Sequence, residues 1–229
     1  MREVFHDELQ RITDDLVEMA HRVGSAIARS TTALLDADVQ LADSVIEADQ
    51  AIDLKRHDLD AHAIDVLARQ APVATDLRVV VTAMRMSADL ERMGDLARHV
   101  AKLARLRYPE AAVPDELRAP VLQMGQVGER LVELVAQVLV TQDLEETRGI
   151  EQVDDEMDSL QRDLFAVLVD GHWQHGTQSA VDMALLGRYY ERFGDHAVSV
   201  ARRMRFLVTG EFSESADDLD RGDQLPAGA

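Results

Sequence analysis

The chain has 229 residues, of which 46% are hydrophobic and 29% charged, and its formal net charge is −19. This composition is typical of a folded protein, and a field of that sign repels nucleic-acid backbones and anionic membranes. The absence of cysteine excludes disulfides and thiolate chemistry and fits a reducing compartment. Because the sequence has no signal-peptide pattern at residues 1–8 and no run of about 18 apolar residues, we expect a cytoplasmic protein.

Apolar residues recur at steps of three and four along most of the chain. This spacing places them on one face of a helix, which then needs a partner helix to cover it. No segment alternates apolar and polar residues over the length of a strand. We therefore predict an all-α fold of six long antiparallel helices, with apolar stripes at residues 9–26, 41–52, 77–88, 117–138 and 150–167 and a less regular sixth helix over 179–208.

Short polar corners mark the ends of these helices. Asp38 and Asp143 are placed to cap the second and fifth helices, and a loop framed by two glycines at 171–176 precedes the sixth. The strongest boundary lies in the middle of the chain, where two prolines stand close together. The pattern predicts two tandem three-helix bundles at residues 1–108 and 116–210, joined by a linker at 109–115 and followed by a disordered acidic tail at 211–229.

The two halves share an acidic signature. The sequence ERMGD at residues 91–95 matches ERFGD at residues 191–195, with four of the five positions identical. The second and fifth helices each carry the pattern Asp-x-x-x-Asp. We interpret this recurrence as a duplicated three-helix unit with two acidic pairs in each half. The eight acidic residues are Asp49, Asp53, Glu91 and Asp95 in the first half and Asp154, Asp158, Glu191 and Asp195 in the second.

These acidic pairs are placed where helices meet. Four residues advance a helix by about 6 Å and return to nearly the same face. A glycine inside a helix costs about 1 kcal/mol relative to alanine, so the matched Gly94 and Gly194 predict a close helix approach at each site. In the third helix, Glu91 and Asp95 continue the apolar stripe that we expect to be buried, which is Leu77, Val81, Met84 and Ala88.

Four carboxylates gathered in this way repel one another. Each pair about 5 Å apart costs roughly 3 kcal/mol at an effective dielectric constant near 20. Protonation, a bound cation, or the nearby Arg56, Arg98 and Arg162 would offset this repulsion. Oxygen ligands suit hard cations such as Mg or Mn, and carboxylates also bind ferric iron and zinc. Since one carboxylate can bridge two ions, a multinuclear cluster is compatible with the pattern.

The duplicated motifs resemble the PhoU family. The resemblance rests on DLERMGDLARHV at residues 89–100, YERFGDHAV at 190–198, Asp76-Leu77-Arg78 and the acidic pairs, and it covers residues 1–210. It implies two similar three-helix bundles that bind metal ions (Fe, Zn, Mn or Mg), often as multinuclear clusters. Carried over by position, the metal ligands would be Asp49, Asp53, Glu91, Asp95, Asp154, Asp158, Glu191 and Asp195. The second half departs from the pattern, because Ser179–Asp182 stands in place of the Asp-Leu-Arg opening.

The resemblance also implies a function without catalysis. It implies a negative regulator of phosphate uptake and phosphate signalling, which links the ATPase subunit of a phosphate-specific ABC transporter to a phosphate-sensing histidine kinase. Such a protein would reach the membrane only through its partners. Exposed heptad faces favour a homodimer.

Two other classes of protein fit part of the pattern. A metal-free helical scaffold or adaptor would expose the acidic pairs and show no response to cations. A ferritin-like di-metal carboxylate enzyme needs Glu-x-x-His on two helices, whereas here this spacing occurs only in the first helix, from Glu3 to His6 and from Glu18 to His21. The sequence has no phosphate-cradling glycine loop or dinucleotide fingerprint, so we expect no enzyme.

Overall fold

The computed structural model describes residues 2–211, with side chains from Phe5 onward. This part of the chain contains no strand, which confirms the all-α prediction. The tail predicted at 211–229 lies outside the described residues except for Glu211. The helices are α1 (Arg2–Asp36), α2 (Val39–Gln70), α3 (Ala74–Arg107), the short 3₁₀ helix η1 (Asp115–Leu117), α4 (Arg118–Thr141), α5 (Leu144–Val169) and α6 (Gly176–Thr209).

The helix ends follow the local signals in the sequence. The side chain of Asp38 accepts a hydrogen bond from the backbone N–H of Leu41 at 2.9 Å, and that of Asp143 accepts one from Glu145 at 2.8 Å. Both predicted caps are therefore confirmed. At the other end of the second half, α6 stops at Gly210, whose φ of 77° lies in the left-handed region that glycine adopts without strain.

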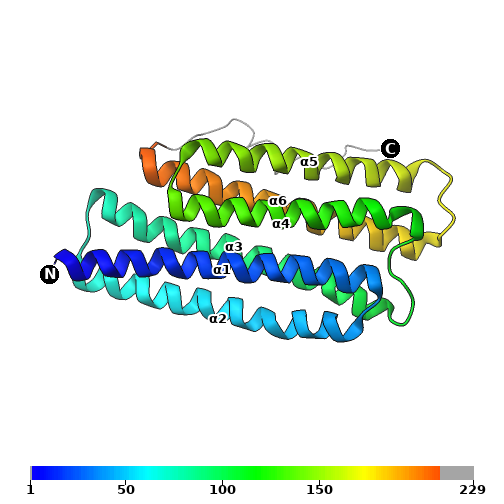
Figure 1. Ribbon diagram of the computed structural model, residues 1–229, viewed down its shortest axis with the longest axis horizontal. Coiled ribbons are helices and arrows are strands. Elements are labelled where there is room, and N and C mark those ends of the chain that lie inside the picture. Colours follow the sequence, from blue (N-terminus) through cyan, green and yellow to red (C-terminus); the bar gives the residue numbers. More distant parts are fainter. Residues whose placement is uncertain (1, 212–229) are drawn as a thin grey trace, which may run out of the picture.

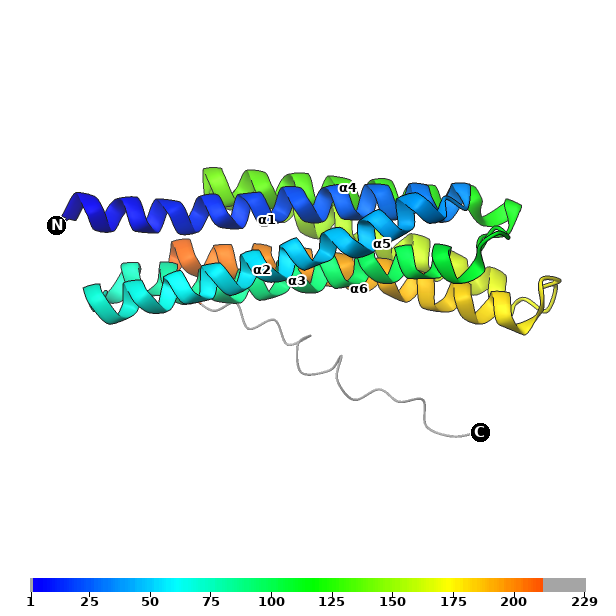
Figure 2. The same ribbon diagram turned by 90° about the horizontal axis from the view of Figure 1, so that it is seen from below.

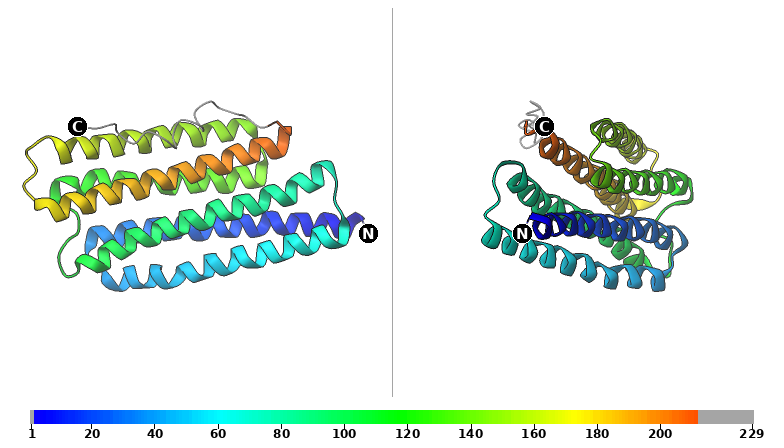
Figure 3. Two further views of the ribbon diagram at one scale, coloured as in Figure 1. Left: turned by 180° about the vertical axis from the view of Figure 1, so that it is seen from behind. Right: turned by 60° about the vertical axis from the view of Figure 1, so that its left-hand side comes forward.

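The helices run up and down along one long axis, with α1–α3 on one side and α4–α6 on the other (Figure 1). The view from behind keeps this division (Figure 3), and the view from below shows helices of both halves overlapping along the same long axis (Figure 2). The inner helices α1 and α3 pack against α4 and α6, while α2 and α5 each contact only helices of their own half extensively. Apolar side chains from all six helices form one continuous core. None of the described helices is both long and apolar enough to cross a bilayer.

The apolar stripes were predicted with different success. All members of the stripe predicted at 117–138 are buried; they are Leu117, Val121, Met124, Gly128, Leu131, Val135 and Val138. The stripe predicted for α3 is wrong, because Leu77 and Val81 are 40% and 37% exposed. Helix α3 contacts α1, α2 and α6, so apolar residues surround most of it and a single stripe does not define its buried side. The residues that it buries completely or nearly so include Val80, Ala83, Met86, Leu90, Met93 and Ala97.

The duplicated helices α3 and α6 pack against each other in opposite directions. Arg107 at the end of α3 donates two hydrogen bonds, of 2.6 and 2.8 Å, to the carboxylate of Asp182 near the start of α6. Further along, the buried Asp89 of α3 accepts a hydrogen bond of 2.5 Å from Nε of Arg203, and Nδ1 of His196 lies 3.2 Å from it. These pairs fix the register of the two repeats relative to each other.

Candidate functional site

In each repeat the acidic pair on the middle helix lies beside the acidic pair on the last helix. We call Asp49, Asp53, Glu91 and Asp95 the first cluster, and Asp154, Asp158, Glu191 and Asp195 the second cluster. In the first cluster, Asp53 and Glu91 line one surface hollow of about 290 Å³. In the second cluster, the charges of Asp195 and Asp158 act on Glu191. Each cluster therefore draws residues from two consecutive helices, α2 and α3 or α5 and α6.

The matched glycines allow this approach. A Cβ atom at Gly94 would lie 3.4 Å from Oδ1 of Asp49 and 3.0 Å from Cδ1 of Ile52. A Cβ atom at Gly194 would lie only 2.1 Å from Oδ1 of Asp154. The close helix approach predicted from the glycines is confirmed in both repeats. At Gly194 the carboxylate of Asp154 uses the space that a Cβ would fill, whereas at Gly94 the closest atom of the middle helix is Cδ1 of Ile52.

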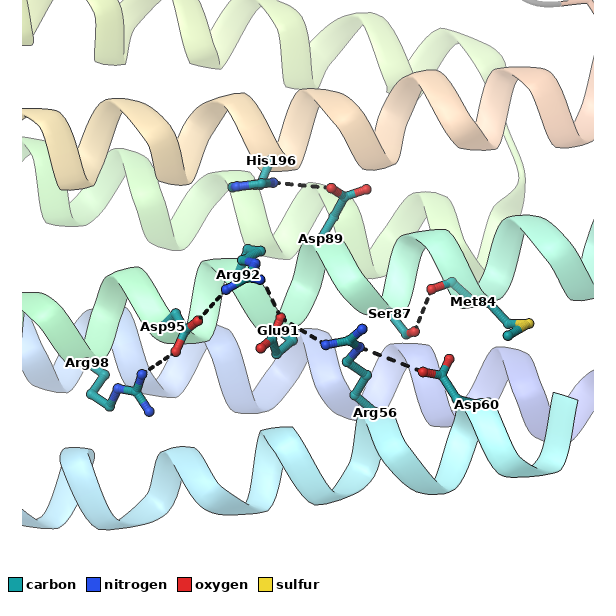
Figure 4. Close-up of polar contacts among 10 residues, drawn as sticks. All are labelled: Arg56, Asp60, Met84, Ser87, Asp89, Glu91, Arg92, Asp95, Arg98 and His196. Atoms are coloured by element: carbon teal, nitrogen blue, oxygen red, sulfur yellow. Dashed lines mark hydrogen bonds and ion pairs between the residues drawn. The ribbon is translucent and has the colours of Figure 1, made fainter. Parts of the chain in front are cut away.

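Arginine side chains hold the first cluster together (Figure 4). The two Nη atoms of Arg98 donate to Oδ2 of Asp49 on α2 and to Oδ1 of Asp95 on α3. Nη1 of Arg56 lies 3.4 Å from Oε2 of Glu91. Because Asp49 is only 3% exposed, its charge is compensated almost entirely by Arg98 and not by water.

The environment of Asp49 disfavours its charged form. Burial raises the pKa of Asp49 above its usual range, and the carboxylates of Asp53 and Asp95 raise it further. The charge of Arg98 and its hydrogen bond oppose this rise in pKa. The first cluster is thus an ion-pair network in which one guanidinium bridges two acidic helices.

The second cluster contains the same acids in a different electrostatic setting. Burial raises the pKa of Glu191, the charge of Asp195 adds to the rise, and Arg188 opposes it. Oε1 of Glu191 accepts a hydrogen bond from Arg188, whereas Oε2 is buried without a hydrogen-bond partner. The positions that match Arg56 and Arg98 hold Gln161 and Val198. Neither of these side chains carries a positive charge.

The donor set decides which ligand each cluster suits. Carboxylate oxygens suit a hard cation, and Oε2 of Glu191 is buried without a hydrogen-bond partner and could serve as one ligand. Within the described residues, however, no three acidic or histidine side chains converge on one point as metal ligands do. An ion at the second cluster therefore requires its carboxylates to turn toward it. At the first cluster Arg98 already provides the positive charge.

Some of these contacts follow from the sequence and others do not. Arg98, one of the nearby arginines expected to offset the repulsion, lies three residues after Asp95 and forms an ion pair with it. The bridge from Arg98 to Asp49 was not predicted, since it depends on how α2 and α3 are aligned. Arg56 lies three residues after Asp53, but its ion pairs are with Asp60 and Glu91. No spacing signal in the sequence identifies these contacts between helices.

The fold and its two clusters define a class of protein: a duplicated three-helix-bundle protein with one acidic cluster in each repeat. A family model described as the PhoU domain matches the chain twice, at residues 16–104 and 121–204. The chain belongs to the PhoU family.

Similar proteins agree with this assignment over nearly the whole chain. The phosphate-specific transport system accessory protein PhoU homolog 2 of Mycobacterium tuberculosis is 46% identical over 212 residues, which are 93% of this chain and 100% of that protein. The homolog 1 protein of Mycobacterium leprae is 45% identical, covering 93% and 96% of the two chains.

Solved structures share the fold. The phosphate transport system regulatory protein PhoU from Streptococcus pneumoniae superposes with a TM-score of 0.83 at 23% identity, over 92% of this chain and all of that one. PhoU from Pseudomonas aeruginosa gives a TM-score of 0.79 at 26% identity, over 90% of this chain and all of that one.

Proposed function

We propose that this protein is a non-enzymatic, negative regulator of phosphate uptake and phosphate signalling. The observation that carries the proposal is the double match to the PhoU domain, together with 46% identity to a protein named as an accessory of phosphate-specific transport. The architecture is consistent with regulation by binding, since long helices present extended surfaces and the acids lie on helices that face outward in part. The protein would act in the cytoplasm and reach the membrane only through its partners.

The proposed partners are the ATPase subunit of a phosphate-specific ABC transporter and a phosphate-sensing histidine kinase. The net charge of −19 favours partner surfaces that carry basic patches. A second copy of the chain is also proposed, because Leu77, Val81, Val181 and Leu185 leave apolar surface exposed on α3 and α6. Analytical ultracentrifugation tests this homodimer directly, and a monomer at all micromolar concentrations would contradict it.

Cation binding is part of the proposal. The second cluster would hold an ion of the Fe, Zn, Mn or Mg class through Asp154, Asp158, Glu191 and Asp195. The ion would supply positive charge and join α5 to α6. In the first cluster, Arg98 and Arg56 occupy the corresponding electrostatic role in this structure, so these residues do not fit an ion without rearrangement.

The regulatory role is tested by deleting the gene in its own host. We expect higher phosphate uptake and expression of a phosphate-starvation reporter in phosphate-rich medium, with both effects reversed by the wild-type gene. Unchanged uptake and unchanged reporter expression would refute the proposal. Binding of the purified protein to the transporter ATPase and to the cytoplasmic part of the kinase, measured separately, identifies which partner it contacts.

A metal-free adaptor is the second candidate, and one observation favours it. Arg98 already pairs with two acids of the first cluster, and no three ligands converge in the described part of the chain. An adaptor would keep both partner interactions after thorough chelation, whereas a cation-dependent regulator would lose them. Partner binding measured before and after chelation therefore separates the two candidates.

A further inference from the structure

We propose that the groove between α4 and α5 binds a segment of a partner protein that carries a lysine or arginine beside an apolar side chain. The groove has a volume of about 720 Å³, and none of the eight cluster acids lines it. Its walls combine the apolar Val127 and Leu160 with Glu129, Glu133 and Glu156. This inference deepens the proposed function and rests on its claim of regulation by binding, because it names the chemistry by which a partner would be recognised.

Two of the three glutamates in the groove lack a positive partner. Glu156 is ion-paired with Arg130, which also lines the groove. Within residues 5–211, by contrast, neither Glu129 nor Glu133 forms an ion pair, and the two lie one helical turn apart on α4. Burial raises the pKa of Glu129, and the charge of Glu133 raises it further. A cationic side chain placed between them would relieve this repulsion.

The apolar part of the groove favours a side chain over a free ion. Val127 is 3% exposed and belongs to the core, and Leu160 packs against that core while remaining partly exposed. Lysine and arginine have an apolar stem and a charged end, so the stem would lie on these residues while the charge meets the glutamates. The lining residues of α4 run from Gln123 to Glu133, which is about 15 Å along the helix axis. A helical segment of about ten residues has the same length.

The first repeat identifies what the matched positions can hold. The two matches to the family model begin at residues 16 and 121, so α1 and α4 correspond at an offset of 105. The acidic pairs of α2 and α5 keep the same offset. Lys55 and Glu18 of the first repeat therefore correspond to Leu160 and Gln123, which both line the groove of the second.

A lysine of the chain itself lies between the helices of the first repeat. Nζ of Lys55 on α2 is 2.6 Å from Oδ1 of Asp15 and 2.7 Å from Oε2 of Glu18 on α1. The fold thus places an ammonium group between the first two helices, against carboxylates of the first one. In the second repeat Leu160 replaces this lysine, while α4 keeps acids of its own. The missing ammonium group is the one that we expect a partner to supply.

The test uses a fluorescein-labelled amphipathic helical peptide with leucines on one face and lysines beside them. A second peptide has glutamine in place of every lysine. Binding of each peptide to the purified protein is measured by fluorescence anisotropy at about 0.15 M salt, where distant exposed charges are largely screened. We expect the lysine peptide to bind the wild type about tenfold more tightly than the glutamine peptide.

L160K introduces the lysine of the first repeat into the groove, and should weaken binding of the lysine peptide about tenfold. The matched control is L122K, which adds the same charge to α4 at a side chain that is 46% exposed and does not line the groove. It should change the affinity by less than about twofold. Affinity of L160K equal to that of the wild type, or an equal loss in both variants, would overturn the proposal.

A second variant keeps the test valid if L160K does not fold, as judged by far-UV circular dichroism. E129Q/E133Q removes the two unpaired charges and keeps the shape of both side chains, so we again expect a loss of about tenfold. E145Q is its control, at a side chain of α5 that is 74% exposed. If E129Q/E133Q binds the lysine peptide as tightly as the wild type does, the groove is not the site.

The same variants separate this inference from the proposed function. The transporter ATPase and the cytoplasmic part of the kinase are each titrated against the wild type and L160K. If neither binds the wild type while the lysine peptide binds and L160K weakens it, the groove is supported and the proposed partners are refuted. If both bind the wild type and L160K equally, the partners are supported and their docking in the groove is refuted.

Discussion

The carboxylate of Asp154 on α5 lies against the backbone of Gly194 on α6, in the place where a side chain at residue 194 would begin. A Cβ atom there would be 2.1 Å from Oδ1 of Asp154. The first repeat differs, because a Cβ atom at Gly94 would lie 3.4 Å from Oδ1 of Asp49, an ordinary contact, and 3.0 Å from Cδ1 of Ile52. The glycine of the repeated ERxGD motif therefore allows close packing in both repeats, and in the second repeat it also lets an acid of the neighbouring helix reach the cluster.

Gly194→Ala should move the carboxylate of Asp154 away from its present position and change the stability of the fold only slightly. The clashing atom is the end of a side chain that can rotate, and alanine gains about 1 kcal/mol in helix propensity. We expect a small change in the free energy of unfolding, measured in urea, and a loss of Mn²⁺ affinity of roughly tenfold. Affinity equal to that of the wild type would show that Asp154 does not contribute to cation binding.

Gly125→Ala should destabilise the protein by about 1–3 kcal/mol. A Cβ atom there would lie 2.5 Å from Cγ2 and 2.7 Å from Oγ1 of the buried Thr31, whose hydroxyl is 2.6 Å from that of Tyr190. The control is Gly149→Ala, where the nearest side-chain atom, Cδ1 of Leu134, is 4.0 Å away. It should stabilise the helix by up to about 1 kcal/mol. Urea unfolding of both variants measures the contrast, and equal effects would contradict it.

Asp89→Asn should weaken the contact between the repeats. Asp89 is buried and accepts a hydrogen bond of 2.5 Å from Arg203, which is itself 33% exposed. Because of that exposure we expect the free energy of unfolding, measured by chemical denaturation, to fall by only about 1–3 kcal/mol. Asp43→Asn is the matched control, because its pair with Arg105 at 3.3 Å is about half exposed on both sides. The control should change stability by less than about 0.5 kcal/mol. A similar loss in both variants would refute the interpretation.

Glu129 should make stability depend on pH in a predictable direction. It lines a groove of about 720 Å³ between α4 and α5, where burial raises its pKa and the nearby Glu133 raises it further. The folded state then binds the proton more tightly than the unfolded state, whose glutamate keeps a pKa near 4.5. As pH falls from above the raised pKa of the folded state toward about 4.5, the pKa of the unfolded state, protonation of Glu129 increasingly stabilises the folded protein. This stabilisation is lost as pH rises.

The measurement compares urea unfolding of the wild type and Glu129→Gln between neutral pH and about pH 4.5. We expect the variant to be relatively more stable at neutral pH, with the advantage disappearing on acidification. Glu145→Gln is the control, because the Glu145 side chain is 74% exposed. A difference between variant and wild type that stays constant with pH would show that Glu129 has an ordinary pKa.

Much of the candidate site could be predicted from the sequence. The ERxGD repeat and the Asp-x-x-x-Asp pairs identify the acids that lie together, and the two matched glycines indicate where the helices approach closely. The sequence shows that arginines lie close to these acids along the chain, but it does not predict which acids they contact. Arg56 pairs with Glu91 across helices instead of with Asp53, because helix alignment and not spacing sets this contact.

The sequence by itself determined the six helices, their caps at Asp38 and Asp143, and the duplication, since each depends on interactions between residues close along the chain. Only the tertiary structure decided that α3 is covered on three sides and that Arg98 joins Asp49 to Asp95. Those features depend on how helices distant in sequence are aligned. The packing of the whole core sets that alignment, and no local pattern encodes it.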